Sequence, residues 1–180
     1  MGTAWYLRLF YMPILNVILA TVLAAIIKPK RMNAPELSTP MKIVGVMNLA
    51  ALCAVLWFIS FRINLAFWIG MGVVVSGHVV NGLAYSAMRE HHEKRKAVVD
   101  WGIYGVVRHP HFLHSVLTSL GVIIMGWRLS AIYAIVWIYF GFSLLYTRSA
   151  ILMEEKRTVE KLGEEYEDYM RRVPRHFLIN

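Results

Sequence analysis

Long apolar runs are the feature that most limits how this chain can fold. Three of them, Ala4 to Ile27, Ile43 to Phe61 and Leu65 to Ala84, have the length of a helix that crosses a bilayer. A hydrocarbon core of roughly 30 Å requires about 20 mostly apolar residues in a helix. The sequence therefore predicts three transmembrane helices in its N-terminal half.

Two shorter apolar runs follow, Phe112 to Met125 and Leu129 to Tyr146, separated only by Gly126-Trp127-Arg128. Their proximity predicts a tight helical hairpin. Of the 180 residues, 58% are hydrophobic and 17% are charged, which is too apolar for a soluble domain of this length. We therefore expect an all-α integral membrane protein with five transmembrane helices.

Basic residues are divided unevenly between the two sides of these spans. Sixteen of the 19 Lys and Arg residues, and all 11 acidic residues, fall on the side that carries the C-terminal tail. Arg8, Arg62 and Arg128 lie on or near the other side. Because basic loops stay in the cytosol, we expect a cytosolic tail. Topology and anionic lipid headgroups account for the net charge of +8, so no nucleic-acid partner is needed.

The expected organisation is one membrane domain covering residues 1–180. Three N-terminal spans occupy 1–84, a cytosolic loop occupies 85–111, the hairpin occupies 112–146, and a cytosolic amphipathic tail helix occupies 147–180. Small residues in the third span, such as Gly70 and Gly77, allow close helix packing or leave room for a ligand.

The start of the fourth span has the pattern of a helix N-terminus. Pro110 suits the first turn of a helix, which leaves Arg108 and His109 at its start. Backbone N–H groups and the helix dipole favour an anion there. Anchoring of Arg108 and His109 to lipid headgroups at the interface is the alternative interpretation.

The segment from Arg148 to Val173 has the spacing of an amphipathic helix that continues the fifth span. On a helical wheel Glu155 falls on the apolar stripe, Glu154 flanks it, and Arg148 lies on the same face two turns earlier. A carboxylate on such a stripe needs a partner, because burying it alone costs several kcal/mol. Arg148 is one candidate partner, and a cationic or polyhydroxyl ligand is the other. Gly163 is the weak point of a continuous helix.

Three motifs follow one another in the C-terminal half of the chain. They are GIYGVVRHPHF at 102–112, Glu154-Glu155, and LGEEYEDYMRRVP at 162–174. In this order and spacing they resemble the isoprenylcysteine carboxyl methyltransferase and phospholipid N-methyltransferase superfamily, over roughly residues 98–174. Phe112 stands where that superfamily usually has tyrosine, and His114 stands where a small residue is common.

The resemblance implies an integral-membrane methyltransferase that uses S-adenosylmethionine in a pocket without a Rossmann fold. The pocket would be formed by the last two spans and cytosolic segments, which makes 85–111 a cofactor-binding loop. A lipid or lipidated acceptor would enter from the bilayer. The chain has no G-x-G-x-x-G motif after a strand, in agreement with such a pocket.

The same resemblance assigns site residues. Val98, Val99 and Tyr104 would line the adenosine pocket, Glu155 would hold the polar end of the cofactor, and Arg148 would face the acceptor. The catalytic set that we expect is Arg148, Glu155 and His111. The full set of expected cofactor-binding residues is Val98, Val99, Tyr104, Arg108, His109, Pro110, His111, Phe112, Glu154 and Glu155.

The acceptor is left open between two chemistries. A carboxylate needs no base, whereas a protonated amine must first lose a proton, for which His111 and His114 are candidate bases. We expect methyl transfer like that of an isoprenylcysteine carboxyl O-methyltransferase, with a phospholipid amine N-methyltransferase as the alternative. The oligomeric state is open as well.

A membrane reductase or a metal- or haem-binding membrane protein is the remaining alternative. The chain has seven histidines, and imidazole is a common metal ligand. However, His109, His111 and His114 do not share a helical face, so we expect no metal site. Cys53 is the single cysteine, which excludes an internal disulfide.

Overall fold

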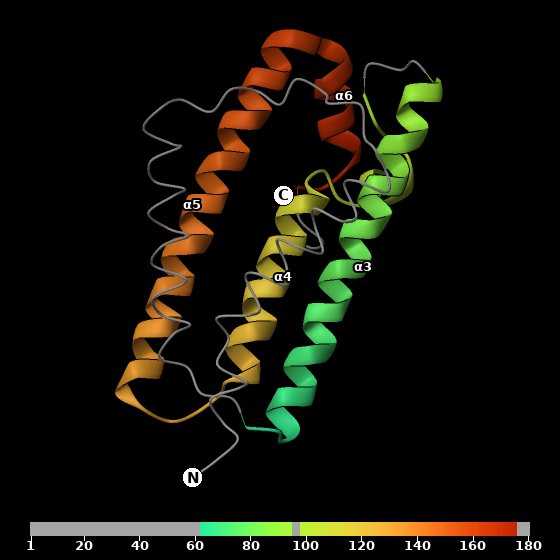
Figure 1. Cartoon of the computed structure of the whole chain (residues 1–180). Helices are drawn as coiled ribbons and strands as arrows, with labels where there is room; N and C mark the ends of the chain where they lie inside the picture. The colour runs from blue at the N-terminus through green and yellow to red at the C-terminus, as the bar shows by residue number, and fades with distance from the viewer. Residues whose placement is uncertain (1–61, 95–97, 176–180) are drawn as a thin grey trace.

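The computed structural model describes residues 62–94 and 98–175, and all the regular elements within these ranges are helical. The expected spans at 4–27 and 43–61, and Cys53, lie outside the described residues. The elements are α3 (Leu65–Lys94), the 3-10 helix η1 (Gly102–Gly105), α4 (Pro110–Met125), α5 (Ala131–Leu162) and α6 (Glu164–Arg172). Figure 1 shows α3, α4 and α5 side by side, with α6 folded back at one end.

Helix α3 contains the third predicted span and continues beyond it. Its first turn is capped by Asn64, whose Oδ1 accepts a hydrogen bond of 3.0 Å from the Phe67 amide. The helix runs on to Lys94, so the prediction of a loop beginning at residue 85 was wrong for residues 85–94. This stretch contains neither proline nor glycine, and nothing in it stops helix propagation.

Two of the described helices are long and apolar enough to cross a membrane by length and composition. They are α3 over Leu65–Arg89 and α5 over Tyr133–Leu162. Only 28% and 22% of their most apolar windows are buried, so neither resembles the buried core helix of a soluble protein. Apolar side chains such as Trp68, Val79 and Phe142 point outward from them. Helix α4 is a shorter apolar helix beside α3.

Glycines bring α3 and α4 into direct backbone contact. A Cβ placed on Gly70 would collide with the Gly121 carbonyl oxygen and would lie 2.5 Å from the Met125 amide nitrogen. A Cβ on Gly77 would lie 3.0 Å from the Thr118 hydroxyl, whereas one on Gly72 would meet nothing within 4 Å. Small residues are the usual means of close helix packing in membranes. The packing role predicted for Gly70 and Gly77 is therefore confirmed.

An apolar cluster closes the end of the bundle at which α4 leads into α5. Its buried members come from three helices, and the Tyr133 hydroxyl donates a hydrogen bond to the Ile123 carbonyl. This contact ties the start of α5 to the end of α4, as expected for a hairpin. The buried members are Phe67, Val74, Val122, Ile123, Met125, Tyr133, Val136 and Phe140.

Helix α5 passes without interruption from its apolar half into its charged half and ends at Leu162. Gly163 follows with φ of 57° and ψ of −135°, a conformation that suits glycine because it has no Cβ. The predicted continuous helix to Val173 was therefore wrong, since the chain reverses at Gly163 into α6 (Figure 1). Acidic residues occupy the first turn of α6 and Arg171 and Arg172 its last, which matches the helix dipole.

Candidate functional site

Glu155 is the centre of a buried charge cluster beyond the apolar half of α5. The residue is 5% exposed, and its Oε1 lies 3.0 Å from Arg108 Nη1 and accepts a 3.2 Å hydrogen bond from His109 Nε2. Arg175 donates to both carboxylate oxygens, with Nη2 2.6 Å from Oε2. A buried carboxylate with this many donors is well compensated.

This environment sets the ionisation of Glu155. Burial acts to raise the pKa of its carboxyl group, but the hydrogen bonds from His109 and Arg175 and the charges of Arg108 and Arg175 outweigh burial. The pKa falls from its ordinary value of 4.5 to about 2. The bond to Glu155 raises the pKa of Arg175 in turn. The Glu155 carboxylate is therefore ionised at neutral pH.

Arg148, one of the two candidate partners considered for Glu155, is not among the partners that the structure gives this carboxylate. Arg148 is exposed on α5. The partners of Glu155 come from the start of α4 and from the residue after Pro174. The Arg108 amide also donates to the Pro174 carbonyl at 3.1 Å, so the chain beyond α6 is tied to the start of α4. Arg175 was missed because it follows the proline that ends the periodic pattern.

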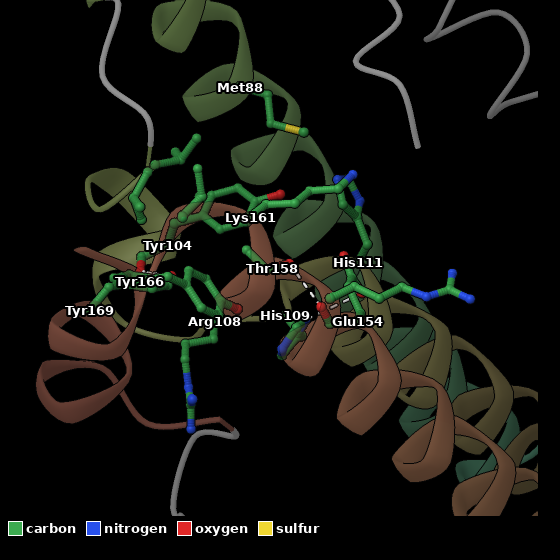
Figure 2. A pocket seen from close by; sticks show the side chains of 14 residues that line it. Met88, Tyr104, Arg108, His109, His111, Glu154, Thr158, Lys161, Tyr166 and Tyr169 are labelled. Atoms are coloured by element: carbon green, nitrogen blue, oxygen red, sulfur yellow. Dashed lines mark hydrogen bonds and ion pairs between the residues drawn. The ribbon is translucent and has the colours of Figure 1, made fainter. Parts of the chain in front are cut away.

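A cavity of about 380 Å³ lies next to this cluster, a volume that suits a ligand of drug or nucleotide size. Figure 2 shows side chains that border it from the end of α3, the 98–111 segment, α5 and α6. The lining residues are Met88, Val98, Val99, Tyr104, Arg108, His109, His111, Glu154, Arg157, Thr158, Lys161, Leu162, Tyr166 and Tyr169.

Seven of the ten expected cofactor-binding residues line this cavity, among them Tyr104, His111 and Glu154. Pro110 and Phe112 are absent from its lining, and the Phe112 ring instead packs edge-on against His109, with ring centroids 5.9 Å apart. Glu155 does not line it either, because its oxygens face the arginines.

His109 links the cavity to the charge cluster. It is 6% exposed and precedes the first turn of α4. Its Nδ1 lies 3.7 Å from Glu154 Oε2, and both side chains are labelled in Figure 2. Its Nε2 is hydrogen-bonded to Glu155. Of the two carboxylates, the more exposed Glu154 is therefore the one that a ligand in the cavity can reach.

On the α5 face of the cavity only Glu154 was predicted, and Arg157, Thr158, Lys161 and Leu162 were not. Glu154, Arg157, Thr158, Lys161 and Leu162 recur at intervals of three and four and share one helical face. The centre of this face is rotated by about 90° from Glu155, the centre of the inward stripe. The prediction followed the apolar stripe, which packs inward, and so it did not include the polar face that carries Arg157 and Lys161.

Three tyrosines provide the aromatic part of the lining. Burial raises the pKa of Tyr166 to about 12, with a further contribution from the charge of Glu155, and burial also raises the pKa values of Tyr104 and Tyr169. The Tyr169 hydroxyl donates a 2.8 Å hydrogen bond to the Tyr104 carbonyl. These phenols therefore stay protonated, and the bond fixes α6 against η1.

His111 lines the cavity and is held from α3. Its Nδ1 lies 2.9 Å from the Oδ1 of Asn81, and its ring makes an edge contact with Tyr85 at a centroid separation of 5.1 Å. His111 precedes the apolar run that starts at Phe112. Burial, and then the charge of His114, lower its pKa, so the imidazole is neutral at pH 7.

His114 and His78 lie one turn or more deeper between α3 and α4. Their rings form an edge contact with a centroid separation of 5.1 Å, and neither lines the cavity. In the part of the chain that the structure describes, no group of three or more His, Cys, Asp or Glu side chains is placed to hold a metal ion. The histidines therefore give no support to the metal or haem alternative.

The helices and the cavity together define an all-helical protein with two candidate membrane-spanning helices and a ligand-sized site beside a charge cluster. Residues 37–173 match the model of a family described as "Protein of unknown function (DUF1295)", and the chain belongs to this family. No curated protein and no solved structure matches the chain.

Proposed function

We propose that this protein is an integral-membrane methyltransferase that uses S-adenosylmethionine and methylates a lipid or lipidated acceptor in the bilayer. The proposal includes five transmembrane helices and a cytosolic C-terminal tail. The cavity would then open at the cytosolic end of α3, α4 and α5. The basic residues on that side of the spans support this orientation.

One observation carries the proposal. The motifs that resemble the methyltransferase superfamily lie more than 40 residues apart, yet Tyr104, His109, Glu154 and Tyr166 border one cavity. Motif residues that served only for headgroup anchoring would not need to meet around one cavity. The convergence therefore favours a ligand site over lipid anchoring.

The lining residues fit the parts of the proposed cofactor. Tyr104, Tyr166 and the two valines offer apolar and aromatic surface to an adenine ring. Glu154 can accept hydrogen bonds from ribose hydroxyls or from the methionine ammonium, and Lys161 can attract the carboxylate. Arg108 is less suited to that carboxylate than expected, because its Nη1 is already committed to Glu155.

S-adenosylmethionine, when bound, supplies a methyl group on a positively charged sulfur. Transfer to a nucleophile is an in-line displacement, so alignment and exclusion of water provide much of the catalysis. The residues of the chain hold and orient the reactants. The Tyr169 to Tyr104 hydrogen bond and the Arg175 to Glu155 pair fasten α6 and the following residues over the site.

Contact of the protein with the bilayer is supported by the outer face of α5. Phe142, Leu144, Leu145 and Leu152 are exposed along the stretch that leads from the apolar half of α5 to the cavity. Exposed apolar side chains on a membrane helix contact acyl chains. Phe142, Leu145 and Leu152 lie on the side of α5 opposite Glu154, so they support contact of this helix with lipid rather than a path into the cavity.

A second function is favoured by the charge of the lining. Arg108, Arg157 and Lys161 outnumber Glu154, the one acidic lining residue. A surplus of cations suits the phosphates of a nicotinamide dinucleotide, which would make the protein a membrane reductase. In Figure 2 the side chains of Arg108 and Lys161 point away from each other and do not meet around one phosphate-sized position, so we place this function second.

Binding measurements separate the two functions. We would titrate the purified protein in detergent with S-adenosylhomocysteine and, separately, with NADPH. Glu154→Gln should weaken S-adenosylhomocysteine binding about tenfold, because a charged hydrogen bond is lost. The exposed Glu160 on the same helix gives the matched control, Glu160→Gln, which should bind as the natural protein does. Binding of NADPH without S-adenosylhomocysteine would replace the methyltransferase proposal with the reductase.

A further inference from the structure

Asn81 is a buried amide in the middle of an apolar helix. It is 6% exposed and lies on the α3 face that meets α4. A polar side chain at such a position is costly unless it is hydrogen-bonded, and in a membrane helix it indicates a functional role by default. Its Oδ1 lies 2.9 Å from the Nδ1 of His111.

This contact determines where the imidazole proton resides. An amide oxygen only accepts, so Nδ1 of His111 must donate and carry the proton. A neutral imidazole that is protonated on Nδ1 has its lone pair on Nε2. Among the residues that the structure places, none is hydrogen-bonded to that Nε2, and the His111 ring borders the cavity.

His111 differs in this respect from the other histidines between α3 and α4. The Nδ1 of His78 donates to the Val74 carbonyl at 2.9 Å, and the Nδ1 of His114 lies 3.3 Å from the Thr118 hydroxyl. Neither ring lines the cavity. This difference distinguishes the two candidate bases, because His111 can contact a ligand in the cavity and His114 cannot.

We propose that Asn81 is a positioning residue that fixes His111 as the Nδ1–H tautomer, so that Nε2 takes a proton from the methyl acceptor. The inference rests on the proposed methyl transfer and deepens it. It assigns a protic nucleophile, such as an amine nitrogen, as the acceptor class rather than a carboxylate, which has no proton to lose.

The acceptor N–H bond breaks and its proton moves to His111 Nε2. The nitrogen lone pair forms the new N–C bond to the methyl group, and the electron pair of the broken C–S bond returns to sulfur as a thioether. His111 then holds both ring protons until water removes one, and Asn81 continues to accept from Nδ1.

The His111 ring has neighbours on α3, η1, α4, α5 and α6. Tyr85 contacts the ring from α3, and His114 follows one turn later on α4. The ring of Tyr104, on η1, has its centroid 6.5 Å from that of His111. Further residues share its cavity from α5 and α6, namely Glu154, Arg157, Lys161, Tyr166 and Tyr169. Glu154 is therefore the acidic side chain that shares the cavity lining with His111.

The tautomer can be measured directly by nitrogen NMR on protein labelled with ¹⁵N-histidine, with the His111 signal assigned from His111→Gln. We expect the Nδ1–H form in the natural protein. Asn81→Leu, which removes the acceptor, should shift the signal towards the Nε2–H form, whereas Asn81→Asp should keep Nδ1–H. An Nε2–H tautomer in the natural protein would overturn the proposal, because the amide would then be donating.

Activity gives the second test, using methyl-labelled S-adenosylmethionine and a total lipid extract. Asn81→Leu should lower kcat by about 10²-fold with the KM for the methyl donor unchanged, and Asn81→Asp should restore most of the rate. The label should be stable to base, as in an amine. A base-labile label with unchanged kcat in Asn81→Leu would overturn the inference but leave methyl transfer intact. If the natural protein does not bind S-adenosylhomocysteine, methyl transfer itself is contradicted.

Discussion

The α3–α4 pair and the α5–α6 tail are held by opposite means. Between α3 and α4, glycines remove side chains so that the backbones touch, and the contact is a matter of shape. Between the tail and the start of α4, Glu155 collects three cationic or polar donors, and the contact is a matter of charge. Close packing of backbones therefore holds α3 against α4, and ion pairs hold the tail against the start of α4.

The difference has a physical reason. Inside a bilayer the hydrophobic effect does not drive helices together, so dispersion between closely fitted surfaces has to do so. On the proposed topology the tail lies at the membrane surface, where charged groups would keep part of their hydration until the tail folds over them. An ion cluster there is specific in geometry, and it fails as a unit when one member is removed.

The largest effect is expected from Glu155→Gln, which breaks the charge-held region. The change leaves the buried Arg108 without its carboxylate, and removing one partner of a buried pair costs about 3–5 kcal/mol. Thermal unfolding in detergent should show a large fall in Tm. Glu154→Gln, at a neighbouring position that is 40% exposed, should have a much smaller effect. Equal effects would contradict the central role of Glu155.

Acid protonates Glu155 and so weakens the same cluster. Because the folded pKa of Glu155 is lowered to about 2 from 4.5, its contribution to stability is present above pH 4.5 and is lost as the pH falls from there towards 2. We expect Tm to fall through this window, and the slope to be shallower in Glu155→Gln. Identical slopes would show that other carboxylates dominate.

The shape-held region is broken by Gly70→Ala, with Gly72→Ala as the matched control on the same helix. The first Cβ collides with the Gly121 backbone, and overpacking of this kind costs about 1–3 kcal/mol. The second Cβ meets nothing within 4 Å and should be neutral or slightly stabilising, because alanine favours helix. The two values of Tm should therefore move apart, and a common shift would argue against glycine packing.

A smaller loss is expected from Tyr169→Phe, which sharpens the comparison within the tail. It removes the hydrogen bond to the Tyr104 carbonyl, for a cost of about 1–2 kcal/mol. Tyr85→Phe changes a tyrosine for which no hydroxyl bond is present among the described contacts, so it controls for the substitution itself. Hydrogen exchange at η1 should rise in the first variant alone.

The smallest effect should come from Arg171→Gln on the exposed face of α6. Its partners, Glu167 at 3.8 Å and Asp168 at 3.3 Å, are also largely exposed, and such pairs contribute at most about 0.5 kcal/mol. We expect the Tm to stay unchanged within error. A loss approaching that of Glu155→Gln would mean that charge stabilises this tail irrespective of burial.

Much of the helical framework could be predicted from local pattern. The apolar runs gave the positions of α3, α4 and α5, and Pro110 marked the first residue of α4 correctly. The cavity segments around Tyr104 and Glu154 were also found, because they belong to ordered motifs. Local periodicity and motif order suffice where each residue acts through near neighbours.

The remainder depended on contacts between distant parts of the chain. Gly163 was recognised as a weak point, but the reversal into α6 was not predicted from propensity alone. Arg175 reaches Glu155 only because of that reversal, and Lys161 joins the cavity only because of how α5 is rotated. Helical periodicity gives relative positions on one helix, and it does not give the rotation against its neighbours.

Hydrogen–deuterium exchange of the detergent-solubilised protein, with and without S-adenosylhomocysteine, tests the central claim most directly. If the methyl donor binds in the cavity, we expect ligand-dependent protection of residues 98–109 and 154–169, the segments that border it. It predicts no change at residues 115–140, where α4 and α5 form the apolar hairpin. Protection confined to that hairpin, or none at saturating ligand, would contradict a methyl-donor site at this end of the molecule.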